Sequence, residues 1–479
     1  MELFDLTIKE ARDGLLKKKF SSRELVSACL DRIKKLEPKL NAFITVCEKE
    51  AREQTQIADK KMRDLGDMGD TRELFVRYPL LGIPISVKDN YCTKGIKTTA
   101  ASHVLMNYIP PYDATVVKRL KEAGTIILGK TNMDAWAHGS STETSDFFTT
   151  RNPWDLTRLP GGSSGGSAAS VAAAETIAAV GSETAGSIRQ PSAWCGVVGF
   201  KPTYGRVSRY GLIAMASSLD CPGPITKTVE DAAIILQTIA GWDSCDATTS
   251  PKQVPDFLRI IRNGVRGIKI GIPQKYFSVA ETEVAKKVDE AVKILERLGA
   301  EIKEISLFDP KYAIAVYTIL QRSEVSSNLA RYDGIRFGFG RERFADEARR
   351  RIMLGTYYLS AGYYEAYYLK AQKVRTIILE DFEQVFKGID VIVGPTSPSA
   401  ALSVGSSKND PMFGEMADVL VEPSTIAGLP GLNLSCGFTK DGLPVGMQII
   451  GPQFSEELLF RVGYAYEQET QWYKMKPKL

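Results

Sequence analysis

The spacing of apolar positions predicts helices at the start of the chain. Two patterns, Thr7–Glu10 and Ser21–Glu24, match the capping box, in which a hydroxyl and a glutamate satisfy free backbone N–H groups at a helix start. Apolar residues recur at helical spacing after the second pattern, and Pro38 is expected to end this helix. A short strand over residues 41–46 and a charged helix over 48–65 are expected next. We therefore predict a helical N-terminal part over about residues 1–70.

From about residue 75 to 240 short apolar strands alternate with helices. Leu80–Val87 and Thr125–Leu128 have the apolar runs of buried strands, and Ala114–Ala123 between them predicts a helix that ends at Gly124. Because repeated alternation of strands and helices is typical of α/β proteins, the sequence predicts an α/β fold with a covered sheet.

The clearest break in the pattern is the linker-like stretch at residues 241–256. Beyond it the sequence predicts further helices and strands: strands at 267–272, 300–306 and 389–393, two strands within 431–451, an amphipathic helix at 280–298 and a long, tyrosine-rich helical region at 345–387. Because the break is short and strands resume after it, we expect one domain over residues 1–479, with its parts at about 1–70, 75–240 and 257–479.

Composition narrows the class of protein. Apolar residues make up 44% of the 479 residues and charged residues 25%, as in soluble globular proteins, and the net charge of +4 does not indicate a nucleic-acid binder. The most apolar stretch, residues 168–180, contains Glu175 and is too short to cross a bilayer, and no signal peptide is visible. Seven scattered cysteines without a C-x-x-C pair fit a reducing compartment. We expect a cytoplasmic protein without a metal site.

Residues Gly124–Thr131 match the P-loop pattern that binds phosphates in nucleotide-binding proteins. A P-loop lies between a strand and a following helix, with its backbone N–H groups free. Here the four middle residues are Thr-Ile-Ile-Leu, and the predicted helix precedes them. We therefore interpret this segment as a glycine helix cap followed by a buried strand.

A G-x-S-x-G pattern occurs twice, at Gly161–Gly165 and at Gly162–Gly166. In α/β-hydrolases this pattern carries the nucleophilic serine, and the catalytic histidine follows later in the chain. This chain has two histidines, His103 and His138, and both precede Ser163. That order is therefore excluded, while a His–Asp–Ser order remains open as a minor alternative.

The Gly- and Ser-rich segment 160–200 is a candidate for catalytic loops. A flexible linker is the alternative, but a helix-forming run at 168–175 and a strand-like run at 176–180 interrupt the segment. Glycines at 161, 162, 165, 166 and 186 are expected to permit left-handed backbone and close approach to a substrate. The run Thr184–Ser187, followed by a helix start, is suited to directing several backbone N–H groups at one oxygen.

A serine nucleophile needs a base, and lysine can serve when burial lowers the pKa of its amine. Lys88 ends the apolar stretch Leu80–Val87, where its side chain can be buried beside polar loops. An ordinary lysine that reaches solvent from a strand end is the alternative.

These features together resemble the amidase signature family. The resemblance rests on Pro160–Ser167, Gly181–Pro191 and Lys88, which precedes Ser163 by 75 positions, while Ser187 follows Ser163 by 24. It implies a large mixed, twisted sheet covered on both faces by helices. It also implies that Ser187 is the nucleophile, that Ser163 follows a cis peptide bond and relays the proton, and that Lys88 is the base. The oxyanion hole is then formed by the backbone of Thr184, Ala185, Gly186 and Ser187.

Within this family the chain is most similar to the A subunits of glutamyl-tRNA(Gln) and aspartyl-tRNA(Asn) amidotransferases. The similar segments span much of the chain: Leu81–Asn90, Gly129–Asp134, Gly199–Gly211, Ser323–Gly334, Arg351–Thr356 and Ala427–Pro430. The resemblance implies that glutamine binds with its carboxylate on Arg351 and its amino group on Asp418. Tyr317 would line the site, with Thr318 as the alternative.

The same resemblance implies partners and a division of labour. Ammonia freed from glutamine would pass to a partner in a heterotrimer with subunits B and C, which converts Glu-tRNA(Gln) to Gln-tRNA(Gln) with ATP and Mg. The tRNA would be held mainly by the partner, and this chain would need no cofactor and no membrane. Ala185 and His138 depart from the family, which has glycine and commonly methionine at these positions. Two alternatives remain: a free-standing amidase of small or fatty amides, and a non-catalytic assembly subunit.

Overall fold

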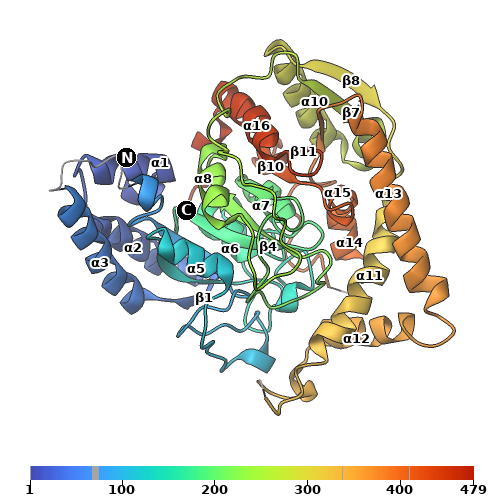
Figure 1. Ribbon diagram of the computed structural model, residues 1–479, viewed down its shortest axis with the longest axis horizontal. Helices are drawn as coiled ribbons and strands as arrows, with labels where there is room; N and C mark the ends of the chain where they lie inside the picture. Colours follow the sequence, from blue (N-terminus) through green and yellow to red (C-terminus); the bar gives the residue numbers. More distant parts are fainter. Residues whose placement is uncertain (1, 67–74, 337, 409) are drawn as a thin grey trace.

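The computed structural model describes residues 2–66, 75–336, 338–408 and 410–479, and Figure 1 shows their arrangement. Residues 67–70 of the expected N-terminal part lie outside the described residues. Eleven strands form one sheet in the order β1-β3-β2-β4-β6-β5-β10-β11-β9-β7-β8. Their bounds are β1 (Phe43–Val46), β2 (Pro84–Lys88), β3 (Ile126–Thr131), β4 (Ala178–Glu183), β5 (Val198–Lys201), β6 (Cys221–Thr226), β7 (Lys269–Pro273), β8 (Glu301–Ile305), β9 (Val391–Pro395), β10 (Gly431–Phe438) and β11 (Pro444–Ile450).

The sheet is mixed, as the resemblance implies. Strand β2 pairs in parallel with β3 and β4, and β7 pairs in parallel with β8 and β9. The middle of the sheet is antiparallel, from β4 through β6, β5, β10 and β11 to β9. Strands from both sides of the stretch 241–256 therefore belong to the same sheet.

Helices cover both faces of the sheet, as strand β10 shows. A side chain added at Gly446 of β11 would meet both the Asn433 amide oxygen and Ala193 of α7 (Arg189–Cys195), so Asn433 points to the face that α7 covers. The neighbouring Leu432 instead contacts Gly463 of α16 (Glu456–Thr470). Because successive side chains of a strand point to opposite faces, α7 and α16 lie on opposite sides of the sheet.

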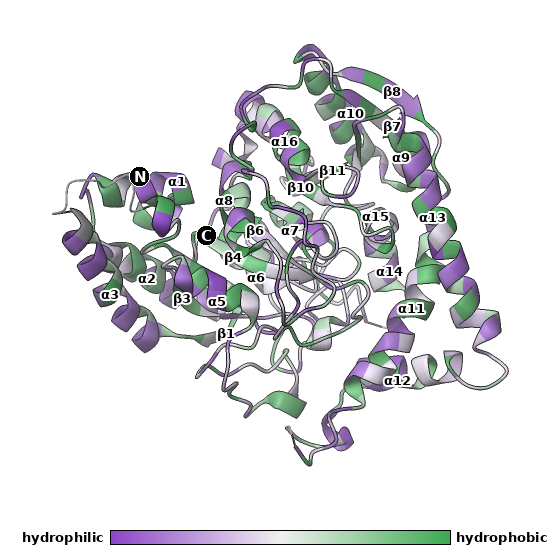
Figure 2. Ribbon diagram, viewed as in Figure 1, coloured by the Kyte–Doolittle hydropathy of each residue, from purple (hydrophilic) through white to green (hydrophobic). Residues whose placement is uncertain are grey.

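The N-terminal helices begin where the sequence predicts. Capping boxes are present at Thr7 for α1 (Ile8–Leu16) and at Ser21 for α2 (Ser22–Leu40). The prediction that α2 ends at Pro38 is wrong by two residues, because α2 continues to Leu40 and stops at Asn41 in the left-handed conformation (φ 53°). Proline removes one hydrogen bond of the helix and crowds the preceding turn, and the buried side chains of Leu36 and Leu40 stabilise the last turn despite this cost. Helix α3 (Glu48–Gly66) carries both hydrophilic and hydrophobic residues in Figure 2.

The other helices belong to the sheet layers or to a wall beside them. Figure 1 shows the wall helices α11 to α15 along one side of the sheet. The layer and wall helices are α5 (Thr115–Glu122), α6 (Gly165–Ala172), α8 (Val229–Ile239), α9 (Gln274–Val279), α10 (Thr282–Arg297), α11 (Lys311–Leu329), α12 (Asp346–Tyr358), α13 (Lys370–Phe386), α14 (Phe413–Asp418) and α15 (Glu422–Ile426).

The helical region predicted over 345–387 is divided in the structure. Helix α12 ends at Tyr358, a turn follows, and a π-helical segment (Glu365–Leu369) leads into α13. Gly362 in this turn has φ +83°, a left-handed conformation that glycine adopts without a steric penalty. The tyrosine-rich pattern therefore predicted helical residues correctly and missed the reversal between them.

Two further observations concern the described residues as a whole. All seven cysteines are free, and six of them are buried. None of the helices in the described ranges is both long and apolar enough to cross a membrane.

Candidate active site

Lys88 is the last residue of β2, and its side chain is fully buried. Its amine donates to Ser163 Oγ at 2.7 Å and to the carbonyl of Ser182 at 3.1 Å. Burial lowers the pKa of Lys88 to about 7, although the carboxylates of Asp134, Asp220 and Glu183 act in the opposite direction. A lysine held in this way is substantially neutral near pH 7 and can accept a proton.

Ser163 lies in the loop that leads into α6, directly beside Lys88. The Gly162–Ser163 peptide bond is cis, as the resemblance implies. A side chain at Gly162 would collide with the backbone N of Ser141, at 2.6 Å, and with the Asp134 carboxylate. The loop 139–141 therefore lies against the backbone that carries Ser163.

Ser187 lies in the loop between β4 and α7 and is 4% exposed. Its carbonyl accepts a hydrogen bond from the N–H of Ser164 at 3.1 Å, which ties this loop to the loop of Ser163. Among the described residues no hydrogen bond joins the hydroxyls of Ser163 and Ser187. Catalytic hydrogen bonds often tighten only when substrate is bound, so the arrangement remains compatible with proton transfer between them.

The loop Thr184–Ser187 has the properties of an oxyanion hole. The Thr184 hydroxyl donates to Asp220 at 2.7 Å, and the carbonyl of Ala185 accepts from the Thr425 hydroxyl at 2.7 Å, so the start of the loop is fixed. Within the described part of the chain no protein group accepts from the backbone N–H groups of Ala185, Gly186 and Ser187. These three donors are free to bind an oxyanion.

The start of the helix after Ser187 was expected to add to the oxyanion hole, and the structure contradicts this expectation. The N–H groups of Ile188 and Arg189 donate to the Glu183 carboxylate at 3.0 and 2.9 Å. The Arg189 guanidinium binds the same carboxylate at 2.6 Å, and both side chains are fully buried. The start of α7 is therefore satisfied inside the protein, so it positions the loop instead of facing the substrate.

The expectation of left-handed glycines holds only at Gly161, which has φ +82°. Gly162, Gly165, Gly166 and Gly186 have no left-handed φ, and each is needed because another part of the chain approaches it closely. At Gly186 a side chain would meet Val421 at 2.6 Å and the Asp418 carboxylate. Close packing is the physical reason for these glycines.

The three residues predicted to bind substrate gather beside this loop, on the wall helices. Asp418 ends α14 next to Gly186, and Ser140 donates to its Oδ2 at 2.8 Å. Arg351 of α12 donates to Glu347 at 2.5 Å and to Gln321 at 2.9 Å. Tyr317 of α11 is buried, which raises the pKa of its hydroxyl, and the charges of Arg351, Glu422 and Asp418 act on it.

The sequence prediction missed several buried polar residues close to Arg351 and Asp418. Arg322 donates to Glu415 at 2.7 Å. Glu422 lies near Asp418, and both its burial and the charge of Asp418 raise the pKa of Glu422. The sequence signal for Arg322 is the pair Gln321–Arg322 inside the otherwise apolar stretch 313–320. Its functional meaning depends on Glu415, which lies 93 positions away in the chain.

Neither histidine is hydrogen-bonded to a serine in the described part of the chain, so the His–Asp–Ser alternative has no support. Both ring nitrogens of His138 are buried without a hydrogen-bond partner. Burial, with the charges of Arg351 and Arg322, lowers the pKa of His138 well below its usual value. The ring of His103 packs edge-on against Phe147.

The segment resembling a P-loop is a helix cap and a buried strand, as predicted. Ile126–Thr131 forms β3. The Lys130 amine is buried, 3.4 Å from Asp89, and it donates to the carbonyl of Tyr91 and to Thr98. Its donors are occupied within the protein and are not available to a phosphate.

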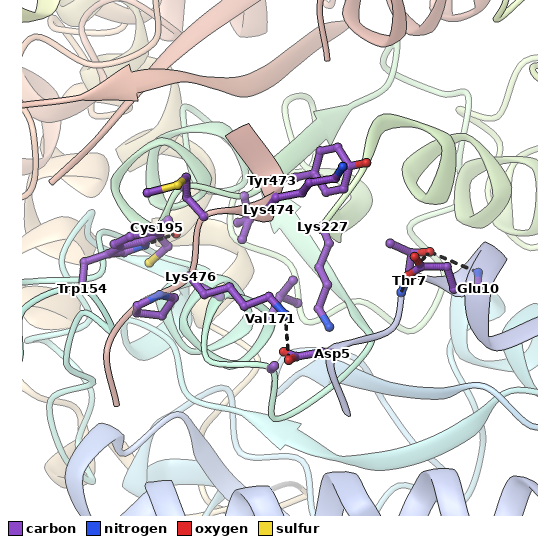
Figure 3. Close-up of a pocket in the computed structure, with 16 residues that line it drawn as sticks. Asp5, Thr7, Glu10, Trp154, Val171, Cys195, Lys227, Tyr473, Lys474 and Lys476 are labelled. Atoms are coloured by element: carbon purple, nitrogen blue, oxygen red, sulfur yellow. Dashed lines mark hydrogen bonds and ion pairs between the residues drawn. The ribbon is translucent and has the colours of Figure 1, made fainter. Parts of the chain in front are cut away.

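A separate pocket of about 300 Å³ lies where the two ends of the chain meet (Figure 3). Asp5 pairs there with Lys476 at 2.7 Å, and Lys227 donates to the carbonyls of Phe4 and Leu6. None of the residues predicted for catalysis or substrate binding lines this pocket. Across the described ranges no group of three or more His, Cys, Asp or Glu side chains is arranged to hold a metal ion.

Comparisons with known proteins agree with this geometry. The chain is 48% identical to the A subunit of the glutamyl-tRNA(Gln) amidotransferase of Desulfatibacillum aliphaticivorans and 50% identical to that of Carboxydothermus hydrogenoformans, over 100% of each chain. The crystal structure of the corresponding subunit from Thermotoga maritima superposes with a TM-score of 0.82 at 44% identity, covering 98% of this chain and 95% of that one. The amidase family model matches residues 24–460. The chain therefore belongs to the amidase family.

Proposed function

We propose that this chain is the glutamine-hydrolysing subunit of a tRNA-dependent amidotransferase. The observation that carries the proposal is the buried Lys88 amine, 2.7 Å from Ser163 Oγ, beside a loop whose backbone N–H groups are free. Full-length relatives at 48% and 50% identity are named as the A subunits of glutamyl-tRNA(Gln) amidotransferases. A non-catalytic assembly subunit would have no need to keep a buried lysine and a free oxyanion loop together.

In the proposed reaction the Ser187 hydroxyl attacks the side-chain amide carbon of glutamine. Its proton passes to Ser163, whose own proton passes to the neutral Lys88 amine. The negative charge that develops on the amide oxygen is held by the N–H groups of Ala185, Gly186 and Ser187. When the C–N bond breaks, the leaving nitrogen takes the proton back through Ser163 and departs as ammonia. Water then hydrolyses the glutamyl ester on Ser187 by the same route.

The wall helices are proposed to recognise the amino-acid part of glutamine. Arginine presents parallel N–H donors that match a carboxylate, so Arg351 binds the α-carboxylate. Asp418 Oδ1 is buried without a hydrogen-bond partner, and it accepts from the α-amino group. Tyr317 lines the pocket between them, while the neighbouring Thr318 remains the alternative lining residue.

The ammonia is proposed to pass to a partner subunit. As the family resemblance implies, the chain is proposed to work in the cytoplasm in a heterotrimer with subunits B and C. The partner activates Glu-tRNA(Gln) with ATP and Mg and holds most of the tRNA. This chain itself uses no cofactor and no metal ion.

The test is ammonia release from glutamine by the chain purified with its partners. We expect release in the wild type and loss of release in Ser187→Ala. The matched control is Ser278→Ala, at an exposed serine on α9. Hydrolysis of simple amides without hydrolysis of glutamine would instead identify a free-standing amidase. Full glutaminase activity in Ser187→Ala would contradict the assignment of Ser187 as the nucleophile.

A further inference from the structure

The wall helices and the adjoining loop 138–140 contain several buried polar atoms without partners. Most buried polar groups in folded proteins are hydrogen-bonded, so each exception needs an explanation. Four residues that face Arg351 and Asp418 contribute such atoms: Arg322 Nε, Gln321 Nε2, both ring nitrogens of His138 and both carboxylate oxygens of Glu422. Unpaired atoms gathered in one place indicate that a polar ligand completes their hydrogen bonds.

Direct hydrogen bonds place these residues close to one another. Gln321 accepts from Arg351, and Arg322 on the same helix donates to Glu415 of α14. Ser140, two positions after His138, donates to Asp418 of that same α14. Helices α11, α12 and α14 and the loop 138–140 therefore converge on the space beside the Ser187 loop.

Arg322 has spare donors on this wall. A guanidinium carries five N–H donors, and Arg322 uses one of them, from Nη2 to Glu415. Its Nε is buried and unpaired, and the residue is 6% exposed. Arg351 uses two nitrogens, for Glu347 and Gln321, and its Nη2 has no partner among the described residues.

Two buried guanidiniums close to each other favour an anion between them. The charge of Arg351 adds to the effect of burial in lowering the pKa of Arg322. Each has one carboxylate partner, Glu415 or Glu347, and Arg351 also donates to Gln321, which leaves Arg322 Nε and Arg351 Nη2 unpaired among the described residues. A carboxylate offers about four lone-pair positions and suits such a set of N–H groups.

We propose that Arg322 is a second carboxylate-binding arginine, which holds the α-carboxylate of the substrate together with Arg351. Glu415 orients Arg322 for this contact. The inference rests on the proposed function, and it adds a specificity determinant: the substrate must carry a free carboxylate next to its amino group. The partnerless oxygens of Asp418 and Glu422 accept the amino group on the other side.

The experiment compares glutamine with 4-aminobutanamide, which is glutamine without its α-carboxylate. Ammonia release gives kcat/KM for both compounds, measured on the chain purified with its partners. We expect Arg322→Gln to lower the glutamine to 4-aminobutanamide ratio of kcat/KM at least tenfold, mainly through KM for glutamine. Arg322→Lys should keep most of the ratio, and Arg349→Gln, at a half-exposed arginine of α12, should leave it unchanged.

A double variant separates recognition from folding. Arg322→Gln alone leaves the buried Glu415 without its partner, which destabilises the wall. Arg322→Gln with Glu415→Gln removes both charges, so a purely structural role predicts that the ratio recovers. We expect the ratio to stay low in the double variant. Recovery of the ratio in the double variant would overturn the inference, and so would an unchanged ratio in both variants. In either case, glutamine hydrolysis by the wild type would still support the proposed function. A wild type that releases no ammonia from glutamine would overturn both.

Discussion

The catalytic loops and the wall helices differ in whether their buried polar groups have hydrogen-bond partners. Around the loops of Ser163 and Ser187 most buried polar groups have partners: Lys88 binds Ser163 and Ser182, and the start of α7 is satisfied by Glu183. On the wall helices and in the adjoining loop 138–140, by contrast, the side chains of His138, Gln321 and Glu422 are buried with unpaired atoms. The difference indicates that hydrogen bonds within the protein position the catalytic groups before substrate binds, whereas the substrate supplies the missing hydrogen bonds of the wall.

The two regions also differ in how the chain builds them. Lys88, Ser163 and Ser187 come from β2 and from the loops next to α6 and β4, and β2 and β4 are neighbouring strands of the sheet. The wall comes from α11, α12, α14 and α15, later in the chain and beside the sheet in Figure 1. Changes in the catalytic loops should therefore alter the chemical step, and changes in the wall should alter substrate binding.

The largest effect is expected for Ser187→Ala. Removing the nucleophile should lower kcat for glutamine by about 10⁴-fold or more, because no other group can form the acyl-enzyme. Glutamine binding to this variant, measured by titration calorimetry, should stay within about threefold of the wild-type KM. Loss of binding equal to the loss of rate would contradict the separation between the loops and the wall.

The next largest effect is expected for Lys88→Met. Loss of the base should lower kcat by about 10³-fold, within the range for general base catalysis. In the wild type the base works only when neutral, and its pKa is about 7. Activity should therefore fall as pH drops below about 7 and level off above about 8. A wild-type rate independent of pH between 6 and 8 would argue against Lys88 as the base.

A smaller and different effect is expected for Arg351→Gln. A hydrogen bond to a charged group contributes about 1.5–3 kcal/mol, so KM for glutamine should rise by about 10- to 100-fold while kcat changes little. Arg349 lies in the same run of three arginines and supplies the control, because Arg349→Gln should leave KM unchanged. If kcat fell as strongly as KM rises, the wall would take part in the chemical step.

The smallest effect is expected for Ala185→Gly in the oxyanion loop. Ala185 does not have a left-handed backbone, and its carbonyl is held by Thr425, so the side chain imposes no strain on the loop. Steady-state kinetics should show kcat within about threefold of the wild type. A larger change in either direction would show that the Ala185 side chain shapes the oxyanion hole.

Much of the fold could be predicted from the sequence, because periodic apolar patterns and caps act locally. The capping boxes at Thr7 and Ser21 and the strand after Gly124 lie where the patterns place them. Errors occurred where a local rule competes with its surroundings: α2 passes Pro38, and the region predicted over 345–387 reverses at Gly362.

Some features of the candidate site could likewise be predicted from the sequence, and others could not. Lys88, Ser163 and Ser187 were identified through the family resemblance, since these residues lie in short segments with a distinctive pattern. The sequence by itself thus determined the helix starts, the buried strands and the identity of the catalytic candidates. Only the tertiary structure decided that Glu183 satisfies the start of α7, that packing explains Gly162 and Gly186, and that Arg322 pairs with Glu415. The physical reason is that these roles depend on contacts between residues far apart in the chain, and a local pattern carries no record of its distant partners.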